Sequence, residues 1–308
     1  MHDLLVIGGG PAGAAAGVYA SRKQLQTLLI TKEWGGQSTV SPDIQNWVGT
    51  VSLSGNELAA QLEKHLRAYA GECVSIIDDV TVTKLEANDS IYRATLHDGT
   101  EHTAQAVLIA SGSKRRRLPV PGAEEFEHKG LTYCATCDGP LFAGQDVAVI
   151  GGGNAGFETA AQLLAYAKSV TLLHRGPEYK ADPVTVERVL EHEHMTALRD
   201  ADTTEVFGEQ FVQGLRYKNL TTGEEHELNV TGIFVEIGMI PNTGFAADLL
   251  ELDDYKRITI DPWTQQTSAP NVWAAGDCTN IRYHQNNISA GDAVRALEDI
   301  YVTLKTKR

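Results

Sequence analysis

The sequence predicts an α/β protein of two Rossmann-like, three-layer domains, with the second domain inserted into the first. Three observations predict this fold. A unit of apolar strand, glycine-rich turn and small-residue helix occurs twice, segments expected to form a β-meander and a closing strand follow each copy, and the C-terminal segment continues the first domain. Alternating strands and helices indicate parallel sheets covered by helices, and 308 residues suggest two domains.

The first copy of this unit lies at the N-terminus. Its Gly-x-Gly-x-x-Gly turn follows a short apolar run and precedes a stretch of small residues. Its expected elements are a strand over residues 4–7, a turn over residues 8–13, a helix over residues 14–22, and strands over residues 27–30, 80–85, 92–96 and 106–110.

The second copy repeats this order, and the tail then adds further elements to the first domain. The expected elements are a strand over residues 147–150, a turn over residues 151–156, a helix over residues 157–167, strands over residues 169–173, 211–219, 226–230 and 232–237, and in the tail strands over residues 258–261 and 272–275 and a helix over residues 289–304.

Turn-forming residues mark the expected domain boundaries, at residues 113–119 and 240–244. The first domain is therefore expected to comprise residues 1–113 and 243–308, and the inserted domain residues 114–242.

Composition and charge exclude several classes of function. The formal net charge of −14 argues against nucleic acids and anionic membranes, because both need clustered lysine and arginine. No apolar run approaches the roughly 18–20 residues of a membrane span, and no leader is evident, so a cytoplasmic protein is expected. The one dense basic run, residues 114–117, either attracts phosphate or an acidic protein or is a solvated linker.

The two glycine turns have a physical reason to bind dinucleotides. The first glycine permits a tight turn, the second lets the backbone approach a pyrophosphate, and the third permits close packing of helix and strand. One such turn is weak evidence, because glycine-rich turns occur in other α/β proteins, but two in the right context are strong evidence. The glycines are Gly8, Gly10 and Gly13 in the first copy and Gly151, Gly153 and Gly156 in the second.

The residues about 20 positions after each turn are expected to contact the ribose. After the first turn the acidic residue arrives late, at Glu33, and a second glycine-rich segment with Gly36 and Gln37 follows. After the second turn the strand ends in His174-Arg175 with no acidic residue. Arg175 suits a 2′-phosphate, with an exposed surface charge as the alternative.

A Cys-x-x-Cys motif, Cys134-Ala135-Thr136-Cys137, is followed at once by Asp138. This spacing brings two sulfurs together, so that one thiol attacks a disulfide while the other resolves it. Asp138 supplies a carboxyl for proton transfer. The alternatives are half a zinc site, which lacks two further well-spaced ligands, or an inert pair. Cys73 and Cys278 are expected to be small buried hydrophobes, and no metal is expected.

These motifs together resemble those of low-molecular-weight, bacterial-type thioredoxin reductases over the whole chain. The Cys-x-x-Cys region also has features of the flavoprotein subunit of alkyl hydroperoxide reductase. The motifs that carry the resemblance are Gly8–Gly13, Gly35-Gly36-Gln37, Asn46-Trp47, Ala110-Ser111-Gly112, Cys134–Gly139, Gly151–Gly156, His174-Arg175, Gly238 with Pro241-Asn242, and Ala274–Asp277.

The resemblance implies FAD on the first domain and NADPH, or NADH, on the inserted domain. It places Asp277 by the ribityl chain and pyrophosphate and Gln285 near the isoalloxazine ring. The residues expected at FAD are Gly8, Gly10, Pro11, Ala12, Gly13, Glu33, Gly36, Gln37, Asn46, Ala110, Gly112, Gly276, Asp277 and Gln285. The residues expected at the nicotinamide nucleotide are Gly151, Gly153, Asn154, Gly156, His174, Arg175 and Lys180.

The resemblance also implies an activity: electrons pass from NADPH through FAD and a Cys134–Cys137 disulfide to thioredoxin or a thioredoxin-like protein. Cys137 is the sulfur on the flavin side, Cys134 attacks the partner, and Asp138 handles the proton. The family forms homodimers. Its inserted domain is thought to swing, with residues 113–119 and 240–244 as the hinges.

Three departures from the family pattern leave alternatives open. Gly176 stands where the family usually has a second arginine, so the preference for NADPH over NADH is expected to weaken. The peroxidase-type flanks favour, as the alternative, an NADH-linked reductase of a glutaredoxin-like or peroxiredoxin partner. Asn286 and Asn287 place amides near the expected flavin ring, with no role yet evident. A flavoprotein sensor without turnover is a third hypothesis.

Overall fold

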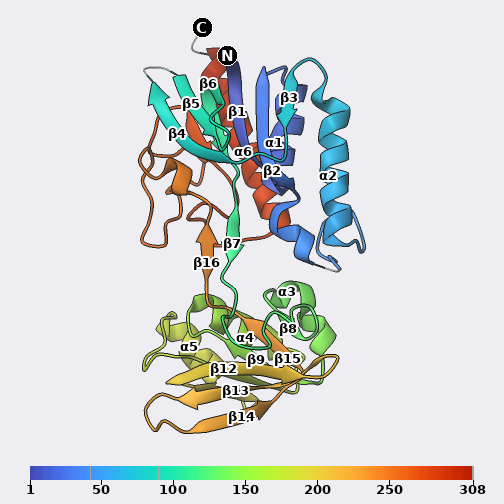
Figure 1. The fold of residues 1–308 in the computed structure, drawn as a ribbon, viewed down its shortest axis with the longest axis vertical. Coiled ribbons are helices and arrows are strands. Elements are labelled where there is room, and N and C mark those ends of the chain that lie inside the picture. Colours follow the sequence, from blue (N-terminus) through green and yellow to red (C-terminus); the bar gives the residue numbers. More distant parts are fainter. Residues whose placement is uncertain (42, 89–90, 307–308) are drawn as a thin grey trace. The chain divides into compact units, whose positions relative to one another are not determined.

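Figure 1 shows the computed structural model of the chain, which describes residues 1–41, 43–88 and 91–306. The chain forms two compact units, the first made of Met1–Lys114 and Ile240–Arg308 and the second of Arg115–Met239. Each is built on a parallel sheet. The predicted fold class, two Rossmann-like units with the second inserted into the first, is therefore confirmed, whereas the cofactor of each predicted domain stays a prediction.

The first unit holds the N-terminal and C-terminal elements. These are β1 (His2–Gly9), α1 (Pro11–Arg22), β2 (Thr27–Trp34), η1 (Gly36–Val40), α2 (Gly55–Ala70), β3 (Val74–Ile77), β4 (Val82–Asn88), β5 (Ile91–Leu96), β6 (Glu101–Ile109), η3 (Gly244–Ala246), β17 (Val272–Ala274) and α6 (Asn286–Thr306). The chain leaves and re-enters this unit through β7 (Ser113–Arg115) and β16 (Met239–Pro241), which pair with each other.

One seven-stranded sheet organises the first unit; six of its strands follow the order β3-β2-β1-β6-β5-β4, and the seventh, β17, also pairs with β6. The strands β3, β2, β1 and β6 are parallel, and the meander β4–β5 runs antiparallel beside the start of β6. The end of β6 pairs instead with β17, through Val272 and Val107. One strand thus holds both the meander and the C-terminal segment.

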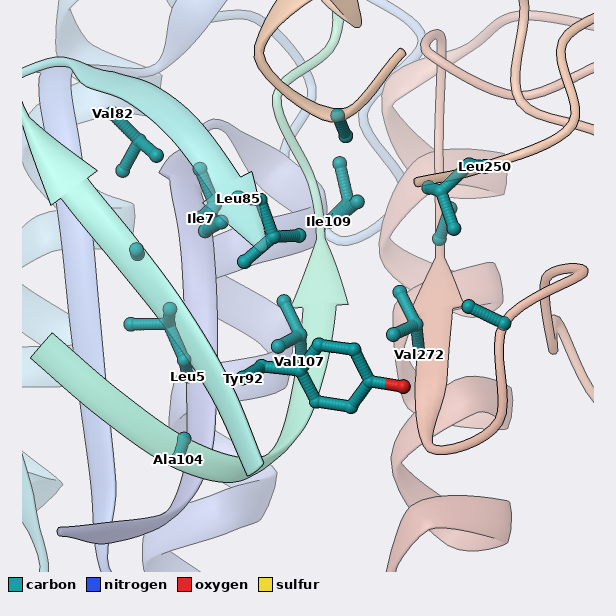
Figure 2. Close-up of a cluster of buried hydrophobic side chains, with 14 of the residues drawn as sticks. Leu5, Ile7, Val82, Leu85, Tyr92, Ala104, Val107, Ile109, Leu250 and Val272 are labelled. Carbon is teal, nitrogen blue, oxygen red and sulfur yellow. The ribbon is translucent and has the colours of Figure 1, made fainter. Parts of the chain in front are cut away.

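Both faces of this sheet are buried, as parallel strands require. Successive residues of β1 point to opposite faces, so Leu5 and Ile7 lie in one apolar cluster and Leu4 and Val6 in another. Figure 2 shows the first cluster, where β1 and β6 meet the meander and Leu250 of the C-terminal segment. The helices α1 and α6 cover the other face.

The second unit repeats this plan with a shorter parallel sheet, in the order β11-β10-β9-β15-β8, and a separate antiparallel sheet, β12-β13-β14. Its elements are β8 (Leu131–Thr132), α3 (Ala135–Asp138), η2 (Gly139–Phe142), β9 (Asp146–Ile150), α4 (Asn154–Leu163), β10 (Ser169–Leu173), α5 (Pro183–Leu190), β11 (Met195–Leu198), β12 (Ala201–Gly208), β13 (Val212–Asn219), β14 (Glu225–Asn229) and β15 (Gly232–Val235). Val147 and Val149 face α4, whereas Ala148 and Ile150 face the antiparallel sheet.

The prediction of a strand over residues 258–261 is wrong. Ile258 forms only isolated bridges, with Leu252 and Thr279. Its side chain is buried with β1 and β6, but its backbone N–H donates to the carbonyl of Cys278 at 2.9 Å, outside any sheet. The apolar pattern therefore predicted burial correctly, while loops supply the backbone hydrogen-bond partners of Ile258.

In the described part of the chain, no helix has the length and apolar character to cross a membrane.

Leu66 of α2 packs against Gly17 of α1, and a substitution at Leu66 tests the packing of these two helices. Leu66 is fully buried, and a Cβ added at Gly17 of α1 would lie only 2.7 Å from its Cδ1 atom. We expect Leu66→Ala to lower the free energy of unfolding by about 2–5 kcal/mol, because it leaves a cavity between two closely packed helices. Urea denaturation followed by circular dichroism measures this loss, and Leu220→Ala, at a residue that is 50% exposed, is the control. Equal effects of the two substitutions would contradict the packing.

Candidate functional site

The first glycine turn is fixed by backbone contacts that leave no room for a side chain. Gly8 has a φ of +123°, and a Cβ added there would lie 2.1 Å from the carbonyl oxygen of Ala110 at the end of β6. A Cβ added at Gly13 would lie 1.8 Å from the carbonyl oxygen of Gly8. The turn therefore seats the first residues of α1 directly against β1, as the spacing of the glycines predicts.

The N-terminus of α1 opens onto a cavity of about 530 Å³. No side chain caps this helix end, and Pro11 occupies its first turn. A Cβ added at Gly10 would have no neighbour nearer than the Gly35 carbonyl oxygen at 3.9 Å, so Gly10 presents bare backbone to the cavity. Free N–H groups at a helix N-terminus attract a pyrophosphate. This end of the cavity fits a dinucleotide.

Most of the residues expected at FAD line this one cavity. They are Gly8, Gly10, Pro11, Ala12, Glu33, Gly36, Gln37, Ala110, Gly112, Gly276 and Asp277. Gly13 acts behind the turn and is not part of the wall. Asn46 and Gln285 are also outside the lining, but they contact each other, with Asn46 Nδ2 donating to Gln285 Oε1 at 3.2 Å.

Two carboxylates, Glu33 and Asp277, lie in the cavity wall. Asp277 Oδ1 accepts a hydrogen bond from Ser289 Oγ at 3.4 Å and lies 3.3 Å from His284 Nδ1. Carboxylates in such a wall accept hydrogen bonds from hydroxyl groups of a sugar or ribityl chain. Val80, Val82 and Phe245 add apolar wall. The residues present therefore fit FAD.

Sequence reasoning missed the role of the amides at the start of α6. Asn286 lines the cavity, and its Oδ1 accepts from Ser38 Oγ at 2.9 Å. Asn287 Nδ2 donates to the backbone carbonyl of Asn46 at 2.8 Å. The unusual amide pair thus ties α6 to η1, through Ser38, and to the loop between η1 and α2, through Asn46. Ser38 and Ser289, which also line the cavity, belong to no motif and gave no signal.

The second glycine turn repeats the geometry of the first. Gly151 has a φ of +133°, and a Cβ there would lie 2.1 Å from the carbonyl oxygen of Glu236 after β15. A Cβ at Gly156 would lie 1.9 Å from the carbonyl oxygen of Gly151. Gly153 precedes α4 without a side-chain cap and has no atom within 4 Å of an added Cβ. This turn offers the same bare helix N-terminus.

The structure gathers the expected nucleotide residues around this turn. The N–H of Lys180 donates to the Gly152 carbonyl at 2.8 Å, and Asn154 Oδ1 accepts from the N–H of Asp182 at 2.7 Å. His174 Nε2 lies 2.7 Å from the carbonyl oxygen of Glu178. Arg175 is exposed and makes no ion pair within residues 1–41, 43–88 and 91–306. Two cations, Arg175 and Lys180, thus lie on the strand–loop segment that borders the turn.

Cys134 and Cys137 form a disulfide, with their Cα atoms 5.3 Å apart. Both residues are partly buried, Cys134 at the end of the segment that follows β8 and Cys137 in α3. Thr132 Oγ1 donates to the Asp138 carboxylate and accepts from the Cys134 N–H at 3.3 Å. The predicted proton-transfer group is thereby held beside the redox pair.

The remaining cysteines differ from each other. Cys278 is fully buried, and burial raises the pKa of its thiol to about 11, which makes it unreactive. Cys73 is only partly buried, with its sulfur 3.2 Å from Gln24 Oε1, so its predicted burial is wrong. In the described parts of the chain no group of three or more His, Cys, Asp or Glu residues is placed to hold a metal ion.

The basic run at residues 114–117 is not a single patch. Lys114 lines the cavity of the first unit. In the second unit the guanidinium of Arg115 donates to the carbonyl of Tyr133, next to the redox pair, and Arg117 lies 3.5 Å from Glu124 and 3.8 Å from Glu127. The run is thus divided among three separate environments.

Glu236 is a polar residue that sequence reasoning missed. It follows β15, is partly buried, and accepts a hydrogen bond at Oε1 from Thr159 Oγ1 of α4 at 3.0 Å. Loss of solvent around its carboxyl raises the pKa of Glu236 to about 7. A carboxyl that titrates near neutral pH next to a ligand-binding turn is a candidate functional group.

Comparisons with known proteins agree on a family. The family described as "Pyridine nucleotide-disulphide oxidoreductase" matches residues 2–292. An NADH dehydrogenase of Bacillus subtilis (strain 168) is 39% identical over 294 residues, 96% of this chain and 57% of that protein. The F subunit of alkyl hydroperoxide reductase of Staphylococcus aureus (strain Mu50 / ATCC 700699) is 39% identical over 295 residues, with the same two shares. The chain thus spans 57% of the length of these relatives.

A solved structure agrees over the full length. The thioredoxin reductase from Streptococcus pyogenes MGAS5005 superposes with a TM-score of 0.89 at 33% identity, covering 99% of both chains.

The pKa of Glu236 predicts how stability depends on pH. A carboxyl whose pKa rises from its ordinary value of 4.5 to about 7 on folding leaves stability intact below pH 4.5 and lowers it as the pH rises through 7. We therefore expect Glu236→Gln to gain stability over the parent at pH 8 by on the order of 3 kcal/mol, and by little at pH 4.5. Urea denaturation of both proteins across this range measures the gain. A gain that does not change with pH would contradict the titration.

Proposed function

The chain belongs to the pyridine nucleotide-disulphide oxidoreductase family, and on this premise we propose that it passes electrons from NADPH through FAD to the disulfide of thioredoxin or a thioredoxin-like protein. The observation that carries the proposal is the Cys134–Cys137 disulfide, which lies at the end of β8 in the sheet that also carries the second glycine turn. A nucleotide site and a redox pair thus share one unit.

The family and its structural neighbours imply FAD and NAD(P)H as cofactors. Bound FAD would take up two electrons from the nicotinamide and make them available to the disulfide. In the first unit the N-terminus of α1 would hold the pyrophosphate, and Glu33 and Asp277 would accept hydrogen bonds from hydroxyl groups. Asn286 would fix the cavity wall through Ser38.

In the second unit the N-terminus of α4 would hold the pyrophosphate of NAD(P)H, and Arg175 and Lys180 would attract the 2′-phosphate of NADPH. With Gly176 in place of a further arginine, two of the family's three cations are present, so the preference for NADPH over NADH is expected to be weak.

The redox pair would act by thiol–disulfide exchange after two-electron reduction. The Cys134 thiolate attacks a sulfur of the partner disulfide, and a mixed disulfide forms as the other partner sulfur leaves as a thiolate. The Cys137 thiolate then attacks Cys134, which restores the Cys134–Cys137 bond and releases the second partner sulfur. Asp138, held by Thr132, would exchange the protons that the leaving thiolates require.

The partner is proposed to be thioredoxin or a similar small protein, by likeness to the solved thioredoxin reductase. A homodimer, the domain swing and a cytoplasmic location remain predictions from the sequence. The alternative partner, a glutaredoxin-like protein or a peroxiredoxin served by NADH, is supported by Gly176 and by the two relatives, one named as an NADH dehydrogenase and the other as part of alkyl hydroperoxide reductase.

Cys134→Ser tests the redox pair. We expect the variant to bind flavin and to lose flavin colour on anaerobic addition of NADPH, as the parent does, because Cys134 lies outside the flavin cavity. Reduction of thioredoxin should fall at least a hundredfold, since the variant lacks the attacking sulfur of Cys134 and Cys137 alone cannot form the disulfide that accepts electrons from the flavin. Anaerobic spectrophotometry and a coupled thiol assay measure the two steps, with Cys73→Ser as the control. Near-parental thioredoxin reduction by Cys134→Ser would refute the assigned pair.

Arg175→Ala tests the nucleotide preference. We expect the KM for NADPH to rise about tenfold and that for NADH to change less than about twofold, because the guanidinium contacts a phosphate that NADH lacks. Steady-state rates with each nucleotide measure this, and Arg188→Ala, on α5, is the control for net charge. A similar rise for both nucleotides would show that Arg175 does not read the 2′-phosphate. If the protein without substitutions prefers NADH, this result favours the alternative partner, a glutaredoxin-like protein or a peroxiredoxin.

A further inference from the structure

We propose that the carboxylate of Glu236 faces the nicotinamide ring of the bound dinucleotide and binds the oxidised, positively charged ring more tightly than the reduced, neutral one. The inference rests on the proposed function in one respect, that a nicotinamide dinucleotide binds at the second glycine turn.

Glu236 lies at the point where the strand order of the sheet reverses. In the order β11-β10-β9-β15-β8, the chain proceeds from β9 to β10 and β11 on one side, while β15 lies on the other side of β9. Dinucleotides bind across such a switch point, beyond the carboxyl ends of the strands. Glu236 is the first residue after β15, and its carbonyl oxygen borders Gly151. It therefore lies at the switch point itself.

The cations of the second unit indicate which half of the nucleotide reaches Glu236. The 2′-phosphate belongs to the adenosine half, and the cations that suit it, Arg175 and Lys180, follow β10. The pyrophosphate crosses the turn after β9. The nicotinamide half must then extend over the β15 side of the switch point, where Glu236 supplies a carboxyl.

A hydrogen bond to α4 gives the direction of the Glu236 side chain. Glu236 Oε1 accepts from Thr159 Oγ1 at 3.0 Å, so the carboxyl lies on the face of the sheet that α4 covers. The parallel register pairs Leu131 with Ile233 and Thr132 with Phe234, so Cys134 and Glu236 each follow the last pair of this register by two residues. The carboxyl thus stands between the glycine turn and the strand that carries the redox pair.

Among the residues that the structure describes, the Glu236 carboxylate accepts a hydrogen bond from Thr159 but forms no ion pair. Arg115 of β7 favours the charged form but donates to the Tyr133 carbonyl. Glu158 of α4 disfavours it. Desolvation dominates and sets the pKa of Glu236 near 7. At a pH above this value a carboxylate faces the space that the nicotinamide is proposed to fill.

The chemistry of the ligand supplies the missing charge. Loss of a hydride converts the neutral dihydronicotinamide into a pyridinium ring with one positive charge. An adjacent carboxylate stabilises that charge in a partly desolvated site. By linkage, binding of NADP⁺ must lower the pKa of Glu236 and release a proton near neutral pH. A neutral ring does neither.

Isothermal titration of the flavin-loaded protein tests this, with NADP⁺ and NAD⁺ as probes between about pH 6 and 8.5. 2′-Phospho-ADP-ribose has the same phosphates but no nicotinamide and corrects for their titration, and tetrahydro-NADPH supplies a neutral ring. For the parent we expect the affinity for NADP⁺ relative to 2′-phospho-ADP-ribose to rise roughly five- to tenfold across this range, with proton release that depends on the buffer. Tetrahydro-NADPH should show no such rise.

Three variants separate the proposal from a general effect of charge or folding. Glu236→Gln should abolish the rise and the proton release while it binds 2′-phospho-ADP-ribose as the parent does. Thr159→Val keeps the carboxyl but removes the hydrogen bond that lowers its pKa, so the midpoint of the rise should move to higher pH. Glu225→Gln, at an exposed residue of β14, should behave as the parent.

A parental rise in Glu236→Gln would overturn the proposal and leave the proposed function intact. Failure of the parent to bind either NADP⁺ or NAD⁺ would overturn both.

Discussion

The contact on which both units depend is the approach of a backbone carbonyl to a glycine with positive φ. In the first unit the Ala110 carbonyl borders Gly8, and in the second the Glu236 carbonyl borders Gly151. Each contact joins the end of the first strand to the end of the strand beside it. The helix that follows begins without a capping side chain, so its free N–H groups remain available to an anion. The same glycine turn therefore fixes the packing of the helix against the sheet and leaves the helix N-terminus free to bind an anion.

The same device serves two different surroundings. In the first unit, carboxylates, apolar residues and the amide of Asn286 surround the turn, and together they enclose a cavity. In the second unit the turn is bordered by Arg175 and Lys180 on one side and by Glu236 on the other. This division suits a resident flavin in one unit and a nucleotide that enters and leaves in the other. The redox pair follows β8, and Glu236 follows the neighbouring strand β15. The nucleotide turn and the redox pair of the second unit thus belong to the same sheet.

Much of this arrangement could be predicted from the sequence, because glycine spacing is a direct consequence of backbone geometry. The two turns follow from it, whereas the insertion was predicted from the order of the expected elements and most of the expected cavity residues from the resemblance to the thioredoxin reductases. The helices α2 and α5 were not predicted, although Ser54 with Glu57, which form a capping box, and Asp182 before Pro183 are local signals for helix starts. Ile258 was misassigned because an apolar pattern reports burial and not pairing. Glu236 belongs to no motif, and its environment depends on Thr159 and Arg115, which only the fold brings near.

The pairing of β17 with the end of β6 constrains how the protein is made on the ribosome. The second unit is continuous in sequence, from Arg115 to Met239, and its parallel and antiparallel sheets take no strand from later in the chain. The first unit is completed only by its C-terminal segment, because β6 gains its last partner with Val272–Ala274, and the cavity of this unit gains Asp277 and Asn286 later still. During synthesis the nascent first unit therefore carries an open sheet edge and exposed apolar surface, the features that recruit chaperones or cause aggregation. The proposed flavin site can therefore take its ligand only after synthesis has passed Asn286 and Ser289.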